Sequence, residues 1–193
     1  MHSALRLFQP CLLLLLVSSA GAQSSKEPPV VGGQAPDFTL KTPAGKSVHL
    51  GALVEQGPAV VVLLRGWPGF QDSYDTQQVA DLVRRTAEFR ARNARVVLVY
   101  PGEADGLKAA ADAFVAAKDL PGNFDLVLDA DYVMTKAYNL RWEGGDETAY
   151  PSTFVLGAGR KVAFAKVSRV HGGRADASEI LQALGVSATT LQP

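Results

Sequence analysis

The chain reads VVVLLRGWPGFQDSYD over residues 60–75, and this stretch decides the fold. Val60–Leu64 is a continuous run of β-branched and aliphatic residues, which is typical of a strand buried on both faces. A loop containing Gly and Pro follows, and from Asp72 to Asn93 apolar residues recur at helical spacing. The stretch therefore predicts a buried strand that leads through a loop into a long helix, which is one unit of an α/β sheet.

The segments on both sides of this unit also alternate between strand and helix patterns. Asp37–Lys41 and Ser47–Leu50 flank a Pro-Ala-Gly turn and predict an N-terminal β-hairpin extension. The remaining elements are predicted, in order, at Pro58–Leu64 (strand), Arg95–Tyr100 (strand), Asp105–Lys118 (helix), Asp125–Leu128 (strand), Ala130–Tyr138 (helix), Pro151–Leu156 with Lys161–Lys166 (hairpin) and Ala175–Leu184 (helix). This order predicts one α/β sandwich, in which helices flank a central mixed β-sheet.

The N-terminus has the features of a secretory signal peptide. Arg6 precedes the apolar run Leu12–Val17, and Ala20-Gly21-Ala22 supplies small residues for cleavage after Ala22. The apolar run is shorter than the ~20 residues that a transmembrane helix needs, so no membrane span is expected after cleavage. We therefore expect an exported, periplasmic or extracellular protein. Its predicted parts are a signal peptide (1–22), a flexible tether (23–34), one domain (35–186) and a C-terminal tail (187–193).

Cysteine content and charge exclude several classes of function. Cys11 is the only cysteine and lies inside the predicted signal peptide, so the mature chain is expected to form no disulfide and to offer no thiolate. The 19 Lys and Arg residues balance 19 Asp and Glu residues without a basic stripe, which argues against nucleic acid as a partner. No cofactor is predicted, and the partner, a protein or a small molecule, is not identified by the sequence.

Three stretches together resemble one known family. They are GQAPDFTL (33–40), RGWPGFQDSYD (65–75) and YPSTFV (150–155), each on the element where that family has it. The chain resembles the AhpC/TSA-type redoxins, the peroxiredoxin-like branch of the thioredoxin superfamily. The resemblance implies a thioredoxin-like sandwich over residues 33–184. It also implies a cis peptide bond before Pro151, facing the redox site.

The same resemblance aligns two aspartates with the family's reactive cysteines. Asp72 takes the first position and Asp75 that of the peroxide-attacking cysteine, while Pro68 matches the family's proline. A carboxylate cannot be oxidised to a sulfenic acid or form a mixed disulfide. The sequence therefore predicts a non-catalytic binding or structural module, with no catalytic residue assigned; the alternative is the antioxidant oxidoreductase that the family resemblance implies. The candidate site loop comprises Pro68, Gly69, Asp72, Asp75, Arg141 and Pro151, with Arg141 as an anion contact.

Several interpretations of the aspartate pair remain open. Asp72 fits a helix N-cap, and Asp75 three residues later resembles a capping box. The pair is also a candidate metal site for a hard cation, to which Asp146 or Glu147 would add an oxygen. Acid–base catalysis by the pair is a third interpretation.

A fourth interpretation makes the loop a recognition surface, with aromatic contacts from Trp67, Phe70 and Tyr74. Arg65, at the end of the buried strand, is expected to orient the loop. His171-Gly172-Gly173-Arg174 is interpreted as a plain turn before the last helix, with phosphate binding as its alternative.

Overall fold

The computed structural model describes residues 27–66, 73–116 and 118–189, with side chains up to Gly185. The predicted signal peptide and the first residues of the tether lie outside these ranges, so they stay predictions. None of the helices within the described ranges is long and apolar enough to cross a membrane.

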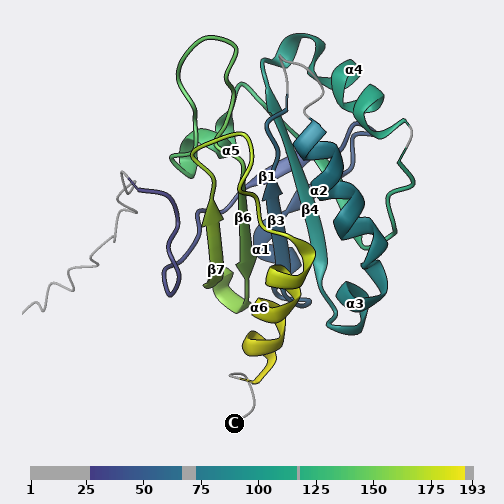
Figure 1. Cartoon of the computed structure of the whole chain (residues 1–193), viewed down its shortest axis with the longest axis vertical. Coiled ribbons are helices and arrows are strands. Elements are labelled where there is room, and N and C mark those ends of the chain that lie inside the picture. The colour runs from purple at the N-terminus through teal and green to yellow at the C-terminus, as the bar shows by residue number, and fades with distance from the viewer. Residues whose placement is uncertain (1–26, 67–72, 117, 190–193) are drawn as a thin grey trace, which may run out of the picture.

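Seven strands form one mixed sheet in the order β2-β1-β5-β4-β3-β6-β7 (Figure 1). Strands β3, β4 and β5 are parallel, and β6, β7, β1 and β2 are added antiparallel on the two sides. The predicted mixed sheet is therefore confirmed. The strands are β1 (Thr39–Lys41), β2 (Ser47–His49), β3 (Ala59–Leu63), β4 (Arg95–Gly102), β5 (Phe124–Ala130), β6 (Ser152–Leu156) and β7 (Val162–Val167).

The run that decided the fold lies inside the sheet, between β4 and β6. Every residue of β3 is buried, and alternate side chains enter opposite cores because successive strand residues point to opposite faces. Val60 and Val62 pack in one hydrophobic cluster, whereas Val61 and Leu63 pack in the other. A strand covered on both faces needs a continuous apolar run, and this is why the pattern lacks polar alternation.

Helices cover both faces of the sheet (Figure 1). The first cluster takes side chains from α2, α3, α4 and α6, and the second takes them from α1 and α5, including the buried Met134. The helices are α1 (Leu50–Val54), α2 (Ser73–Arg84), α3 (Thr86–Ala91), α4 (Ala104–Val115), α5 (Val133–Ala137) and α6 (Ala177–Thr189), with a short 3₁₀ turn η1 (Ala158–Arg160).

The predicted single helix 72–93 is wrong in its described part. It divides into α2 and α3 at Arg85, whose backbone is non-helical (φ −103°, ψ 20°). No Pro or Gly marks the break, and Phe89 keeps its place on the buried face, so the apolar spacing carries no sign of it. Arg85 instead binds Glu88 of α3 and Ser178 of α6, which ties the break to the neighbouring helix.

Three further parts of the chain differ from the prediction. The tether is not free over its described part: Gly32 N–H and Ala35 N–H donate to the carbonyls of Val162 and Arg160, both at 2.8–3.0 Å. At the other end α6 continues to Thr189, so the predicted tail 187–193 begins as helix. The helix predicted at 130–138 starts only at Val133, because Asp131 and Tyr132 have left-handed backbone (φ 56° and 61°).

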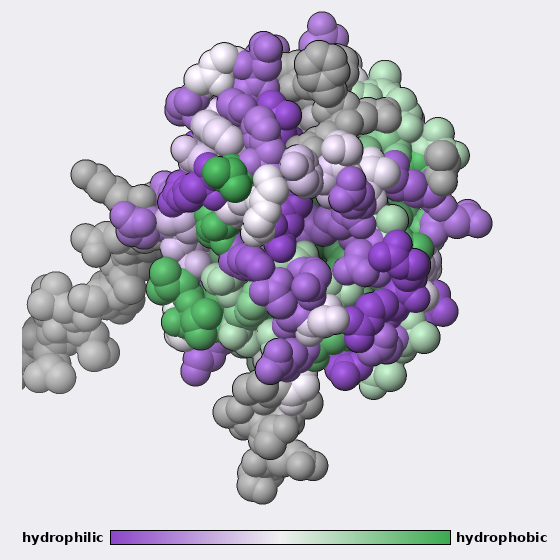
Figure 2. Space-filling model, viewed as in Figure 1, coloured by the Kyte–Doolittle hydropathy of each residue, from purple (hydrophilic) through white to green (hydrophobic). Residues whose placement is uncertain are grey.

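The described surface is mostly polar in the view of Figure 2, where hydrophobic side chains form small separate groups. The large hydrophobic side chains that the structure leaves exposed are Val30, Val31, Tyr74, Val133 and Val170. Two of them, Tyr74 and Val170, lie close to the candidate site described next.

Candidate functional site

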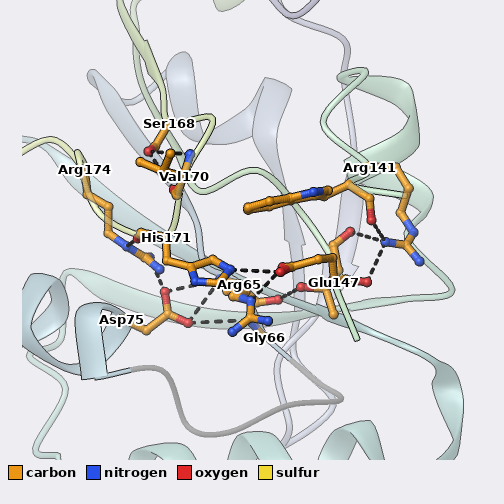
Figure 3. Close-up of polar contacts among 11 residues, drawn as sticks. Arg65, Gly66, Asp75, Arg141, Glu147, Ser168, Val170, His171 and Arg174 are labelled. Carbon is orange, nitrogen blue, oxygen red and sulfur yellow. Dashed lines mark hydrogen bonds and ion pairs between the residues drawn. The ribbon is translucent and has the colours of Figure 1, made fainter. Parts of the chain in front are cut away.

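Asp75 is a buried carboxylate in the first turn of α2, only 2% exposed. Its oxygens accept hydrogen bonds from the Arg65 N–H (3.0 and 3.2 Å) and the Gly66 N–H (3.4 Å). The guanidinium of Arg174, whose side chain is 6% exposed, forms an ion pair with Oδ1 of Asp75 (Figure 3). A buried charge is tolerated when it is paired and hydrogen-bonded, and Asp75 meets both conditions.

The two N–H groups lie where β3 ends. Leu64 N–H still donates to the carbonyl of Val99 (2.9 Å), and Gly66, two residues later, lies against Pro101 of β4. Gly66 has φ +72°, and a β-carbon there would lie 2.1 Å from the carbonyl oxygen of Pro101. Only glycine combines this backbone angle with so close an approach, and the turn aims consecutive N–H groups at Asp75.

Arg174 comes from the loop before α6 and is positioned by that loop. Its Nε donates to the carbonyl of His171 (3.0 Å). The hydroxyl of Ser168 binds the carbonyls of Val170 (2.7 Å) and Gly172 within the same loop. Ser168 N–H in turn donates to the carbonyl of Pro151 (2.9 Å), so the loop is attached to the residue that precedes β6.

Glu147 connects this loop back to β3. Its Oε2 accepts from Arg65 Nε (3.0 Å), and its Oε1 lies 2.9 Å from His171 Nε2. The contacts therefore close a ring, Asp75–Arg65–Glu147–His171–Arg174–Asp75 (Figure 3). Two of its five links use backbone groups: the N–H of Arg65 and the carbonyl of His171. The other three join side chains.

The ring favours the ionised form of Glu147. Burial alone would raise the pKa of Glu147, but the hydrogen bond from His171 and the charge of Arg65 outweigh it and hold that pKa below its usual value. A second group near the ring, Tyr100, is also shifted. Burial is the larger cause, and the negative charge of Asp75 adds to it; together they raise the pKa of Tyr100 to about 12. Tyr100 therefore stays neutral and cannot serve as a base near neutral pH.

A lowered carboxylate pKa makes stability depend on pH in a defined direction. Glu147, and also Asp125 beside Lys46 and Arg95, have pKa values lowered in the folded state. Such groups stabilise the fold above their unfolded pKa values, ~4, and this contribution is lost as the pH falls through their folded values. We expect urea unfolding at pH 7, 5, 4 and 3 to show stability falling mainly below about pH 4. The Glu147→Gln variant should show a shallower fall, and an unchanged slope would contradict this assignment.

Arg141 holds the loop that carries Glu147. Its Nη1 donates to the carbonyls of Trp142, Glu147 (2.8 Å) and Thr148 (2.6 Å), and its guanidinium lies 4.2 Å from the ring centre of Tyr132. Its Nη2 also lies 3.9 Å from a carboxylate oxygen of Glu143, and contact with a bound anion stays a prediction. Arg141 thus does not contact Asp75 in any described hydrogen bond or ion pair; it fixes the backbone of residues 142–148 and so positions Glu147.

An aromatic stack joins the same two loops. Trp142 stacks on Tyr150 with ring centres 4.7 Å apart and lies 5.2 Å from the His171 ring. Arg169 covers the Tyr150 ring at 4.5 Å. Pro151, the last predicted site residue, is buried between this stack and β6.

The structure brings only some of the predicted site residues together. Asp75 belongs to the ring, and the carbonyl of Pro151 accepts a hydrogen bond from Ser168 N–H, in the loop that carries His171 and Arg174. Arg65 contacts Asp75 through its N–H and Glu147 through its side chain, and its role in orienting the loop stays a prediction. The remaining residues of the predicted loop lie outside the described ranges: Trp67, Pro68, Gly69, Phe70 and Asp72. The capping box and the cis bond stay predictions.

The contacts of Asp75 argue against a cation there. Its oxygens face two N–H donors and a guanidinium, all of which repel a metal ion. Glu147, offered by the sequence as a further ligand, is engaged by Arg65 and His171. Within residues 27–66, 73–116 and 118–189, no three His, Cys, Asp or Glu side chains lie together as a metal ion needs.

Sequence reasoning missed the importance of His171 and Arg174. Both lie in the segment interpreted as a plain turn, and Arg174 is 99 residues from Asp75 in the chain. The available signal was the presence of two basic residues in a short Gly-containing loop before the last helix. Their partners become apparent only when that loop is placed beside the start of α2.

Comparisons with known proteins agree with this architecture. A model of the AhpC/TSA family matches residues 31–165. Peroxidoxin BcpB from Mycobacterium tuberculosis has a TM-score of 0.66 at 18% identity, over 84% of this chain and 98% of that one. The bacterioferritin comigratory protein of Xanthomonas campestris has a TM-score of 0.63 at 21% identity, over 78% and 92%. The mitochondrial 2-Cys peroxiredoxin of Plasmodium falciparum has a TM-score of 0.63 at 17% identity, over 83% and 95%. No curated protein sequence matches the chain.

The sheet order and these neighbours show a thioredoxin-like fold with a peroxiredoxin-like architecture. The chain belongs to the AhpC/TSA family, whose model covers more than half of its residues. The fold predicted from the sequence is therefore confirmed.

Proposed function

We propose that this protein is an exported AhpC/TSA-family redoxin without thiol chemistry, in which Asp72 and Asp75 replace the reactive cysteines and the fold serves as a binding or structural module. The observation that carries the proposal is the environment of Asp75. Asp75, to which the resemblance gives the position of the attacking cysteine, is a buried carboxylate fixed by Arg65, Gly66 and Arg174.

The chemistry of the two side chains supports the proposal. A peroxidatic thiolate attacks one oxygen of a peroxide, which breaks the O–O bond and leaves a sulfenic acid on the protein. A carboxylate lacks the polarisable sulfur that this step needs, and residues 12–193 contain no cysteine to replace it. The hydrogen-bond donors around Asp75 would stabilise a thiolate or a carboxylate. A site with Asp75 in place of cysteine would therefore keep its positive environment but lack a nucleophilic sulfur.

A peroxide assay tests this proposal directly. The chain without its leader, mixed with hydrogen peroxide or an alkyl hydroperoxide and a dithiol reductant, is expected to consume no more peroxide than a heat-denatured sample. A catalytic rate above that baseline would refute the proposal.

Variants with cysteine at position 75 provide a positive control for the peroxide assay. The Asp75→Cys and Asp72→Cys/Asp75→Cys variants keep the N–H groups and Arg174, so the new thiol at 75 should titrate below the ordinary ~8.5, as followed by the rate of alkylation against pH. We expect peroxide reduction to appear in these variants. An ordinary thiol pKa with no activity would show that residue 75 does not occupy a thiolate position, and that result would count against the alignment.

A further inference from the structure

Arginines are concentrated in one short stretch of this neutral chain. Residues 84–95 read RRTAEFRARNAR and hold five of the 19 Lys and Arg residues, but only one acid, Glu88. We call these five residues the arginine cluster: Arg84, Arg85, Arg90, Arg92 and Arg95. Because acids and bases balance over the whole chain, the remaining sequence has a surplus of acids, and the charge is unevenly distributed.

The arginine cluster lies at one end of the molecule. It spans the end of α2, the helix α3 and the first residue of β4, and Figure 1 shows α3 at the opposite end of α2 from the turn that carries Asp75. Arg90 Nε donates to Oδ1 of Asn123 (3.2 Å), and Arg95 Nη1 donates to the carbonyl of Gly122 (3.1 Å), so both reach the loop before β5. In the same view, Figure 2 shows hydrophilic side chains gathered over this end.

Acidic side chains neutralise the arginine cluster only in part. Three of its members form ion pairs: Arg84 with Asp81 (3.0 Å), Arg85 with Glu88 (2.6 Å) and Arg95 with Asp125. Arg90 and Arg92 are exposed, and within the described residues neither lies within ion-pair distance of a carboxylate. Their printed partners are neutral: the amide oxygen of Asn123 for Arg90 and the carbonyl of Glu88 (3.0 Å) for Arg92.

Glu88 itself serves two arginines. Hydrogen bonds from Arg85, together with the charges of Arg85 and Arg92, outweigh burial and hold the pKa of Glu88 below its usual value. The carboxylate is therefore ionised at neutral pH and already bound by Arg85 through both of its oxygens. The positive charge of α3 thus remains in excess with every nearby acid ionised.

We propose that the arginine cluster binds the anionic phospholipid headgroups of a bilayer. A guanidinium binds phosphate oxygens through parallel N–H groups, and two or more donors of each exposed arginine are left for this contact. Arg84, Arg90 and Arg92 are exposed along one end of the molecule and do not converge on a single point, so they suit an array of phosphates better than one free phosphate. The inference goes beyond the proposed function and uses none of its residues.

Vesicle binding tests this inference. At about 20 mM NaCl, the chain without its leader should sediment with vesicles that contain phosphatidylglycerol, and should stay in solution with pure phosphatidylcholine. Binding should weaken at about 150 mM NaCl, because salt screens the charges. The Arg90→Gln/Arg92→Gln variant should lower the partition coefficient by about 30-fold, since each cation near an anionic surface contributes a factor of about five. Absence of binding by the wild type, or equal binding to both kinds of vesicle, would overturn the proposal.

A matched variant separates the arginine cluster from net charge. Lys41 and Lys161 are exposed on β1 and just before β7, away from α3. Lys41→Gln/Lys161→Gln removes the same two charges, and its partition coefficient should change much less. Melting temperatures close to that of the wild type check that both variants are folded. Equal losses of binding in the two variants would show that net charge determines the interaction, which contradicts the proposal.

A fluorescent label measures which end of the molecule meets the bilayer. Residues 12–193 contain no cysteine, so Ala91→Cys places an environment-sensitive dye on α3 and Ala163→Cys places it on β7. Phosphatidylglycerol vesicles should shift the emission to the blue for the label at 91 and leave the label at 163 unchanged. A shift at 163 instead would contradict the proposed orientation. Inorganic phosphate at equal ionic strength should displace the chain no better than chloride, and stronger displacement would assign the cluster to free phosphate instead of lipid.

Discussion

Replacing Asp75 by asparagine is expected to lower the free energy of unfolding by about 3–5 kcal/mol. The amide keeps the size of the side chain but removes the negative charge that forms the buried ion pair with the Arg174 guanidinium. It also presents an NH₂ group to donors that need an acceptor, since two N–H groups already point at this position. Urea unfolding followed by circular dichroism measures the loss.

An exposed ion pair provides the matched control. Lys108 and Asp112 form an i,i+4 pair on α4 at 2.6 Å, with side chains 63% and 49% exposed. Asp112→Asn should change stability by less than about 1 kcal/mol, because exposed pairs contribute little. A double-mutant cycle with Arg174→Met then isolates the pair itself, and the double variant should be less destabilised than the sum of the two single variants. A loss for Asp75→Asn no larger than that for Asp112→Asn would contradict the account of a buried pair.

Gly66→Ala is expected to destabilise the protein by about 3 kcal/mol or more, as the sum of two costs. An L-residue at φ +72° is strained, and the added β-carbon would lie 2.1 Å from the carbonyl oxygen of Pro101. The chain must then move away from β4, and the N–H groups that hold Asp75 move with it. The effect therefore reaches the site as well as the sheet.

The chain offers a glycine that separates the two costs. Gly45 has φ +86°, but nothing lies within 4 Å of the position its β-carbon would take. Gly45→Ala should carry only the backbone strain, about 1–2 kcal/mol. The difference between the two variants in chemical denaturation measures the close approach to Pro101. Equal losses would mean that this contact does not constrain the turn.

The alternation of strands and helices was sufficient to predict the architecture. A strand such as β3, which is buried on both faces, requires an uninterrupted run of apolar residues, and this run is visible in the sequence. The hairpin turn at 42–46 is likewise visible from its Pro and Gly. Local conformations without such marks were not predictable. Arg85 interrupts a helix without Gly or Pro, and Asp131 and Tyr132 adopt left-handed backbone although neither is glycine.

The site was predictable only in part, for a related reason. Asp75 attracts attention through the motif around it, and that information is local. Its ion-pair partner lies 99 residues later, and Glu147 lies 82 residues after Arg65. These contacts form because two loops pack together at one end of the strands, and a single sequence contains no local pattern that predicts such packing.

The burial of Met134 has a consequence for the oxidation of this protein. The chain contains three sulfur atoms, in Met1, Cys11 and Met134. The thioether of Met134 belongs to a side chain that is only 1% exposed, on the buried face of α5. Residues 12–193 therefore contain a single sulfur atom, which the core shields from oxidants in solution.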